Sequence, residues 1–233
     1  NIRESAAIAV IVILLVISVA AGFVLFLKTN VVVLVLGVIS FAVGVLYSAG
    51  PVPISRTPFG EVFSGLFMGF LIPFLSAFIH VFDKNIVLLQ FESPILMFRA
   101  NVLEAAYIFI VSVPAVAGIA NIMLANNICD MEDDLENRRY TLPLYIGKER
   151  ALRLFKWIYY GAYLFVIVGI VLRIIPITGL LFFLTFIPIQ RNIRTFEQKQ
   201  SKAETFGLAV MNFTVMNIAL IIAFALGIVL NML

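Results

Sequence analysis

The stretch NNICDMEDD holds three of the four aspartates in the chain. If it is helical, Asn126, Asp130 and Asp134 follow one another at i, i+4 and i+8, with neighbouring Cβ atoms about 5–6 Å apart. Asp133 lies one step round the same face, and Glu132 points roughly the opposite way. Crowded carboxylates repel one another, whereas Mg²⁺ binds carboxylate oxygens together with waters and phosphate oxygens. The pattern therefore predicts a Mg²⁺–phosphate site with Asp130, Asp134 and Asn126 as metal ligands.

Two arginines follow the acidic stretch. Arg138 and Arg139 would supply fixed positive charge for phosphate oxygens. The alternative interpretation is a solvated acidic loop whose arginines only set the membrane topology. A calcium-binding EF-hand is excluded because the stretch has no glycine and no glutamate at the twelfth position of such a loop.

The elements that position these residues must be membrane helices. The chain is 63% hydrophobic and 12% charged, whereas soluble domains are about 25% charged. A spanning helix needs roughly 17–25 mostly apolar residues. Residues 157–190 are too long for one span, and Arg173 and Pro176 suit a turn that divides them. We expect an all-α membrane bundle forming one domain over residues 1–233, with seven spanning helices in the charge-free intervals 6–27, 31–55, 62–82, 105–129, 157–172, 174–190 and 205–233.

The distribution of basic residues predicts the orientation. Seven spans would place twelve of the 16 lysines and arginines on one face, and positive residues are retained in the cytoplasm. The acidic stretch, the Arg56 loop and residues 191–204 would then all be cytoplasmic. Since topology explains the basic residues, nothing indicates a nucleic-acid partner. Residues 83–100 are expected to form a partly apolar loop on the opposite face.

The acidic region carries a family resemblance. The sequence NNICDMEDDLENRRYTLPLYIGKERA resembles the second aspartate-rich motif of the UbiA superfamily of intramembrane prenyltransferases. Within it, the similarity is greatest to the branch that prenylates 1,4-dihydroxy-2-naphthoate in menaquinone synthesis. Cys129 stands where that branch often has arginine. The matching positions are the asparagine pair Asn126 and Asn127, the DxxxD residues Asp130 and Asp134, the basic residue Arg139, and Thr141, Leu142 and Gly147.

A second stretch agrees with this resemblance. FAVGVLYSAGPVPISRTPFGEVFSG is similar to the family's Tyr-x-x-Gly-Pro segment followed by Gly-Glu, with matches at Tyr47, Gly50, Pro51, Gly60 and Glu61. The family places a basic residue in this loop, a position that Arg56 would fill. Tyr47 would shield an allylic cation through its ring face or orient the acceptor. The alternative for Tyr47 is an interfacial aromatic anchor.

The chain departs from the family pattern in one respect. Members have nine spans and a first aspartate-rich motif, which has no counterpart among these residues. Both differences are explained if an N-terminal portion with two spans and the first motif precedes Asn1. Residues 1–233 would then form an N-terminally incomplete prenyltransferase domain.

The resemblance implies transfer of a polyprenyl group from its diphosphate to an aromatic acceptor, with Mg²⁺ as cofactor and the bacterial cell membrane as location. The branch implies 1,4-dihydroxy-2-naphthoate as the acceptor and demethylmenaquinone as the product. Asp130, Asp134, Asn126 and Tyr47 would be catalytic. The alternatives are another aromatic acceptor, a noncatalytic member of the family, or a transporter, which the scarcity of charge within the spans disfavours. The residues expected to bind the diphosphate or the acceptor are Arg138, Arg139, Arg56 and Asn127.

Overall fold

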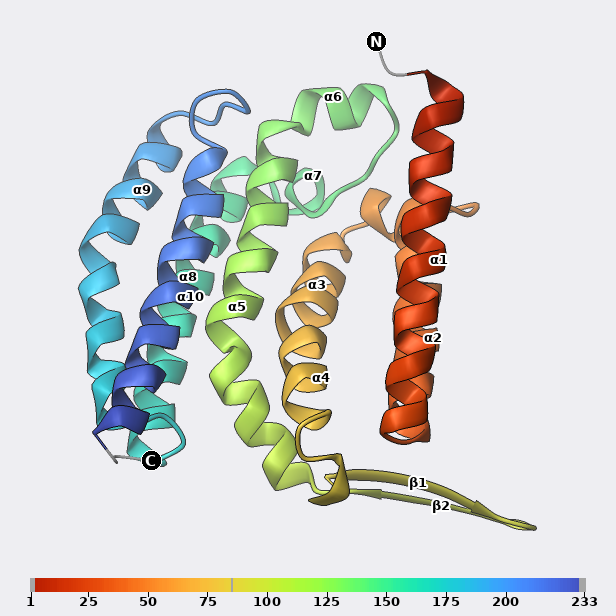
Figure 1. Ribbon diagram of the computed structural model, residues 1–233. Coiled ribbons are helices and arrows are strands. Elements are labelled where there is room, and N and C mark those ends of the chain that lie inside the picture. Colours follow the sequence, from red (N-terminus) through yellow and green to blue (C-terminus); the bar gives the residue numbers. More distant parts are fainter. Residues whose placement is uncertain (1–2, 85, 231–233) are drawn as a thin grey trace. The chain divides into compact units, whose positions relative to one another are not determined.

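The computed structural model describes residues 3–84 and 86–230 (Figure 1). Helices dominate it, as the charge-free intervals predict. The α-helices are α1 (Glu4–Lys28), α2 (Val31–Ser48), α3 (Gly60–Ser64), α4 (Ile72–Phe78), α5 (Val102–Cys129), α6 (Met131–Glu136), α7 (Leu142–Ile146), α8 (Lys148–Val171), α9 (Phe186–Gln198) and α10 (Gly207–Val229). A π-helical segment, Gly65–Leu71, joins α3 to α4, and 3-10 helices cover Ile54–Arg56, Phe82–Lys84 and Ile177–Thr185.

Six helices within the described residues are long and apolar enough to cross a membrane: Glu4–Lys28, Val31–Ser48, Gly60–Phe78, Val102–Cys129, Lys148–Val171 and Gly207–Val229. The predicted all-α membrane fold is therefore confirmed, and the chain is an integral membrane protein. The expected count of seven spans is not confirmed. The predicted span 174–190 forms a 3-10 helix that runs into α9, and α9 carries Arg191 and Arg194.

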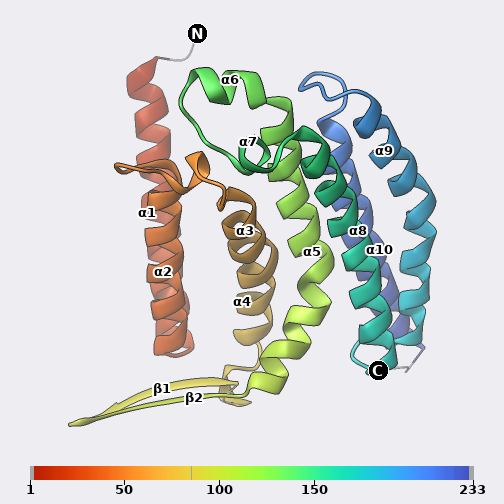
Figure 2. The same cartoon turned by 180° about the vertical axis from the view of Figure 1, so that it is seen from behind.

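The contacts divide the chain into two compact units, and the first comprises residues 1–44 and 75–102. It contains α1, most of α2 and a pair of strands. Figures 1 and 2 both show α1 beside α2. Although α1 is strongly apolar, none of its residues is buried, and α2 buries only Val32 and Val33. Such exposed apolar helices are suited to lipid rather than water.

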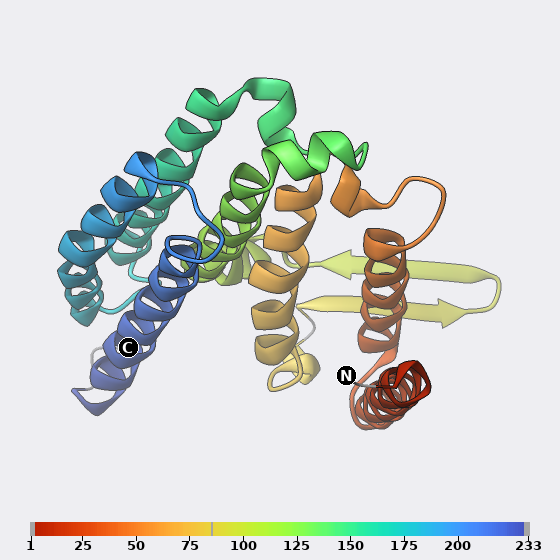
Figure 3. The ribbon, with the colours of Figure 1, turned by 90° about the horizontal axis from the view of Figure 1, so that it is seen from above.

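Most of the predicted outer loop at residues 83–100 forms an antiparallel hairpin, which was not predicted (Figure 3). Strand β1 (Val87–Glu92) pairs with β2 (Ile95–Ala100) in a register that runs from Val87 opposite Ala100 to Glu92 opposite Ile95. Both strands are rich in branched and aromatic side chains, which favour strands. Two six-residue runs separated by Ser93 and Pro94 were the sequence signal for this hairpin.

The second unit comprises residues 45–74 and 103–233, and it contains the predicted site. Its core includes the fully buried side chains Leu124, Phe155, Phe196 and Met216. Polar side chains also join its helices. The Asn121 Nδ2 atom of α5 donates to the carbonyl oxygen of Phe155 in α8 at 2.9 Å, and Asn192 of α9 donates to Oδ1 of Asn212 in α10 at 2.8 Å. Such bonds help hold membrane helices together.

The π-helical segment Gly65–Leu71 approaches α5 closely, and this approach depends on Gly69. A Cβ atom at this position would lie 2.4 Å from the Cα atom and 2.7 Å from the nitrogen of Val116 in α5. Because these are backbone atoms, Gly69→Ala must displace α5, and we expect a loss of about 2–3 kcal/mol in the free energy of unfolding. Titration with SDS in mixed micelles measures this quantity.

The matched control is Gly161→Ala in α8, where an added Cβ meets nothing within 4 Å. This substitution should stabilise the protein by up to about 1 kcal/mol, since alanine favours the helix. Equal effects of the two substitutions would refute the proposed role of Gly69.

Candidate active site

The predicted acidic stripe lies where α5 ends. The helix stops at Cys129, Asp130 forms a turn, and α6 begins at Met131. Helical hydrogen bonds nevertheless cross the break, from the Asp130 nitrogen to the Asn126 carbonyl oxygen at 3.1 Å and from the Asp134 nitrogen to the Asp130 carbonyl oxygen at 2.7 Å. The i, i+4, i+8 spacing is therefore preserved in space.

A lysine that the sequence analysis did not select lies against the first half of the stripe. The Lys202 ammonium donates hydrogen bonds to Oδ2 of Asp130 and Oδ1 of Asn126. Asn126 in turn donates from Nδ2 to the same Asp130 oxygen at 3.3 Å. Lys202 comes from the segment between α9 and α10, which was predicted to share a face with the acidic stretch. Two oxygens of the predicted metal site, one of Asp130 and one of Asn126, thus already contact the positively charged Lys202 ammonium.

The second half of the stripe is Asp134, whose surface is 2% exposed. Its Oδ2 atom accepts a hydrogen bond from the Thr141 hydroxyl at 3.0 Å, and its Oδ1 atom lies 3.3 Å from Nε of Arg139. Burial raises the pKa of the Asp134 carboxyl above its usual value, although the Thr141 hydrogen bond and the Arg139 charge lower it. The Arg139 Nε atom is buried and makes no hydrogen bond with any described residue.

The two predicted diphosphate-binding arginines differ. Arg139 is drawn to Asp134 by the ion pair and by the bond from its backbone nitrogen to the Asp134 carbonyl oxygen at 2.8 Å. Arg138 is exposed, has a φ angle of 53° and forms no ion pair with a described acidic residue. The structure therefore brings Arg139 to the acidic stripe and leaves the Arg138 side chain outside it.

A buried carboxylate joins the two stretches that carried the family resemblance. Glu61 of α3 is 4% exposed, and its Oε1 atom accepts a hydrogen bond from Nδ2 of fully buried Asn127 at 2.9 Å. The other carboxylate oxygen, Oε2, is also buried and has no partner among the described residues. Glu61 was selected only as a motif match, and its direct bond to Asn127 across 66 positions was not predicted.

The remaining predicted residues lie on the neighbouring segments of the same unit. The Tyr47 hydroxyl is 2.9 Å from the hydroxyl of Ser64, and it donates to the sulfur of Met123 in α5 at 3.3 Å. The Arg56 carbonyl oxygen accepts a hydrogen bond from the Tyr140 nitrogen at 3.0 Å, while the Arg56 side chain is exposed. The Arg56 loop is thereby tied to the segment after the acidic stripe.

These residues fit a divalent cation. Within residues 3–84 and 86–230 there is no cluster of three or more histidine, cysteine, aspartate or glutamate side chains that could enclose a metal. Mg²⁺ does not need one, because it usually takes one or two protein carboxylates and completes its shell with waters and substrate phosphates. Asp130 and the amide oxygen of Asn126 offer such ligands beside the Lys202 ammonium, whereas both carboxylate oxygens of buried Asp134 are already held by Thr141 and Arg139.

Comparisons with known proteins place the chain among prenyltransferases. The model of the UbiA prenyltransferase family matches residues 2–221. A 1,4-dihydroxy-2-naphthoate octaprenyltransferase of Bacillus subtilis (strain 168) is 34% identical over 137 residues, which cover 59% of this chain and 37% of that protein. A search of solved structures found no match. Because the family match extends over nearly all of the sequence, the chain belongs to the UbiA prenyltransferase family.

Proposed function

We propose that the protein transfers a polyprenyl group from its diphosphate to an aromatic acceptor, and that the acceptor is 1,4-dihydroxy-2-naphthoate. The observation that carries the proposal is the acidic stripe at the end of α5. There the Lys202 ammonium donates to oxygens of Asp130 and Asn126, and buried Asp134 forms an ion pair with partly exposed Arg139. The similarity to a 1,4-dihydroxy-2-naphthoate octaprenyltransferase supports the choice of acceptor.

In this proposal Asp130, Asp134 and Asn126 would hold Mg²⁺, with Asp134 giving up its contact to Thr141 or Arg139. The bound ion supplies positive charge that stabilises the diphosphate as it leaves. Arg139 and Lys202 add two cationic side chains beside the same carboxylates. Arg138 and Arg56 are exposed on the segments that flank the stripe, where they can contact the diphosphate or the carboxylate of the acceptor.

The proposed reaction balances in bonds and electrons. The allylic C–O bond breaks, and its electron pair leaves with the diphosphate. An electron pair of the acceptor ring then forms the new C–C bond to the allylic carbon. With dihydroxynaphthoate the carboxylate departs as CO₂, and the electrons of its bond restore the aromatic ring. Tyr47, held by Ser64 and Met123, would present its ring to the cation or the acceptor.

The membrane location suits such a substrate. Each CH₂ group transferred from water to an apolar environment contributes about 0.8 kcal/mol. A long isoprenoid chain is therefore far more soluble among membrane helices than in water. Its charged diphosphate would remain at the polar end of α5, where the acidic stripe lies.

The proposed function is tested with the complete protein, Mg²⁺ and a polyprenyl diphosphate, supplied in turn with dihydroxynaphthoate, 4-hydroxybenzoate and homogentisate. Mass spectrometry of the extracted lipids should find the prenylated, decarboxylated product of dihydroxynaphthoate. Product from another acceptor alone would refute the acceptor assignment. Absence of product from all three would refute the assignment of this activity.

The Lys202 contact yields a prediction about metal affinity. Because Lys202 occupies oxygens that Mg²⁺ would bind, Lys202→Met should tighten Mg²⁺ binding in the absence of diphosphate by about ten-fold. Isothermal titration calorimetry of the purified complete protein measures this affinity. Lys199→Met is the matched control, because Lys199 lies in the same segment and pairs with Glu204 instead. An unchanged affinity in Lys202→Met would contradict competition for these oxygens.

A further inference from the structure

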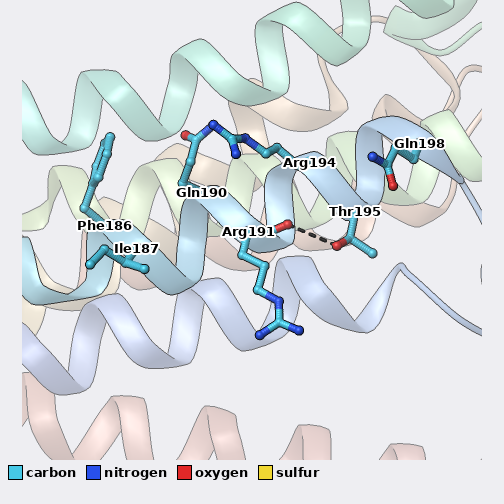
Figure 4. A pocket seen from close by; sticks show the side chains of 7 residues that line it. All are labelled: Phe186, Ile187, Gln190, Arg191, Arg194, Thr195 and Gln198. Carbon is cyan, nitrogen blue, oxygen red and sulfur yellow. Dashed lines mark hydrogen bonds between the residues drawn. The ribbon is translucent and has the colours of Figure 1, made fainter.

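A pocket of about 340 Å³ lies along α9, and all of its lining residues belong to this helix (Figure 4). It begins near α8, where the ring of Phe186 packs against Tyr160 and Tyr163 with centroid distances of 6.1 and 5.3 Å. The Tyr160 hydroxyl also donates to Oε1 of Gln190 at 2.7 Å, which fixes that lining side chain. The volume is at the lower end of the roughly 300–1,000 Å³ of small-molecule sites.

The two ends of this pocket differ in chemistry. Its apolar end is formed by Phe186 and Ile187, and it continues an exposed apolar surface on the preceding 3-10 helix, where Leu184 is 72% exposed. About one turn further along α9, the lining becomes cationic at Arg191 and Arg194. An apolar surface that changes to positive charge within a few ångströms matches the boundary between lipid chains and headgroups.

Neither arginine is neutralised within the described part of the chain. Arg191 and Arg194 are exposed, and neither forms an ion pair with a described acidic residue. Figure 4 shows Arg194 reaching back along the helix toward Gln190, while Arg191 leaves on another side. Because both side chains are exposed, either guanidinium can turn to a phosphate at this surface, and its planar donors suit this anion.

We propose that this pocket binds the headgroup of an anionic phospholipid of the surrounding bilayer. The phosphate contacts Arg191 and Arg194, and an acyl chain lies along Phe186 and Ile187. Basic side chains near a membrane surface attract anionic headgroups. Charge complementarity and continuity with the exposed apolar surface favour a phospholipid over a soluble anion. A soluble anion has no acyl chain that could contact Phe186 and Ile187.

The test is native mass spectrometry of the complete protein released from nanodiscs that contain equal amounts of phosphatidylglycerol and phosphatidylcholine. The wild-type protein should retain phosphatidylglycerol preferentially. The double variant Arg191→Gln/Arg194→Gln should lose that preference by about ten-fold or more. The control is Arg150→Gln/Arg153→Gln, which removes two exposed charges from α8 outside the pocket and should keep the preference.

Three results would overturn the proposal: equal retention of both lipids by the wild-type protein, equal losses in the two double variants, or displacement of the bound lipid by inorganic phosphate alone. A single symmetric peak in size-exclusion chromatography verifies that each variant is folded. The measurement is independent of prenyl transfer, so it can fail while the proposed function stands.

Discussion

Replacing Asp130 or Asp134 by asparagine should lower Mg²⁺-dependent prenyl transfer of the complete protein by at least about 100-fold. Asparagine preserves the size of the side chain and one oxygen but removes the negative charge that binds the metal. A loss of 100-fold corresponds to about 2.7 kcal/mol of transition-state stabilisation, within the several kilocalories that a catalytic metal contributes. Initial rates at saturating substrate and several Mg²⁺ concentrations measure the effect.

Asp133→Asn provides the matched control. Asp133 is adjacent to Asp134 in sequence but is exposed, and its carboxylate contacts none of the predicted site residues within the described part of the chain. This variant should keep activity within about two-fold of the wild-type protein, since exposed charges are well screened. Equal losses of activity in all three variants would indicate a general effect of negative charge and would refute the proposed metal site. Unchanged turnover in both Asp130→Asn and Asp134→Asn would also refute it.

The second large effect is expected in the buried pair of Glu61 and Asn127. Asn127→Leu removes the hydrogen bond from Asn127 to Oε1 of Glu61, whose other oxygen, Oε2, already has no partner among the described residues. A buried polar group that loses its hydrogen-bond partner is costly, so the free energy of unfolding should fall by about 2–3 kcal/mol. SDS titration in mixed micelles measures the change.

A double variant separates the effect of the lost hydrogen bond from the effect of the unpaired Glu61 carboxyl group. Glu61→Leu/Asn127→Leu removes both partners, and it should be less destabilised than Asn127→Leu alone because no buried carboxylate remains. The exposed Asn137 gives a matched control, and Asn137→Leu should change stability by no more than about 0.5 kcal/mol. A double variant that loses as much as the sum of both single variants would contradict this explanation.

The features that could be predicted from sequence are those set by local periodicity and by the membrane. Long charge-free intervals predicted the helices, because lipid requires about 20 apolar residues. The spacing of Asn126, Asp130 and Asp134 predicted the acidic stripe, because the helical hydrogen bonds continue across the break at Asp130. The family resemblance is confirmed by the family match.

Other features of the site depend on contacts between distant parts of the chain. Lys202 reaches Asp130 across 72 positions, and Glu61 reaches Asn127 across 66. No periodicity specifies such pairs. The sequence also did not indicate which of Arg138 and Arg139 pairs with the acidic stripe. This depends on the backbone turn that directs only Arg139 to Asp134. Residues 174–190 were interpreted by hydropathy alone, which does not distinguish a 3-10 helix from an α-helix.

The central claim is that the acidic stripe binds the diphosphate through Mg²⁺. The most direct measurement is isothermal titration of the complete protein with geranylgeranyl diphosphate, without acceptor, in excess Mg²⁺ and in EDTA. We predict saturable binding that requires Mg²⁺ and is lost in Asp130→Asn. Binding of equal affinity in EDTA, or in Asp130→Asn with Mg²⁺ present, would contradict the claim.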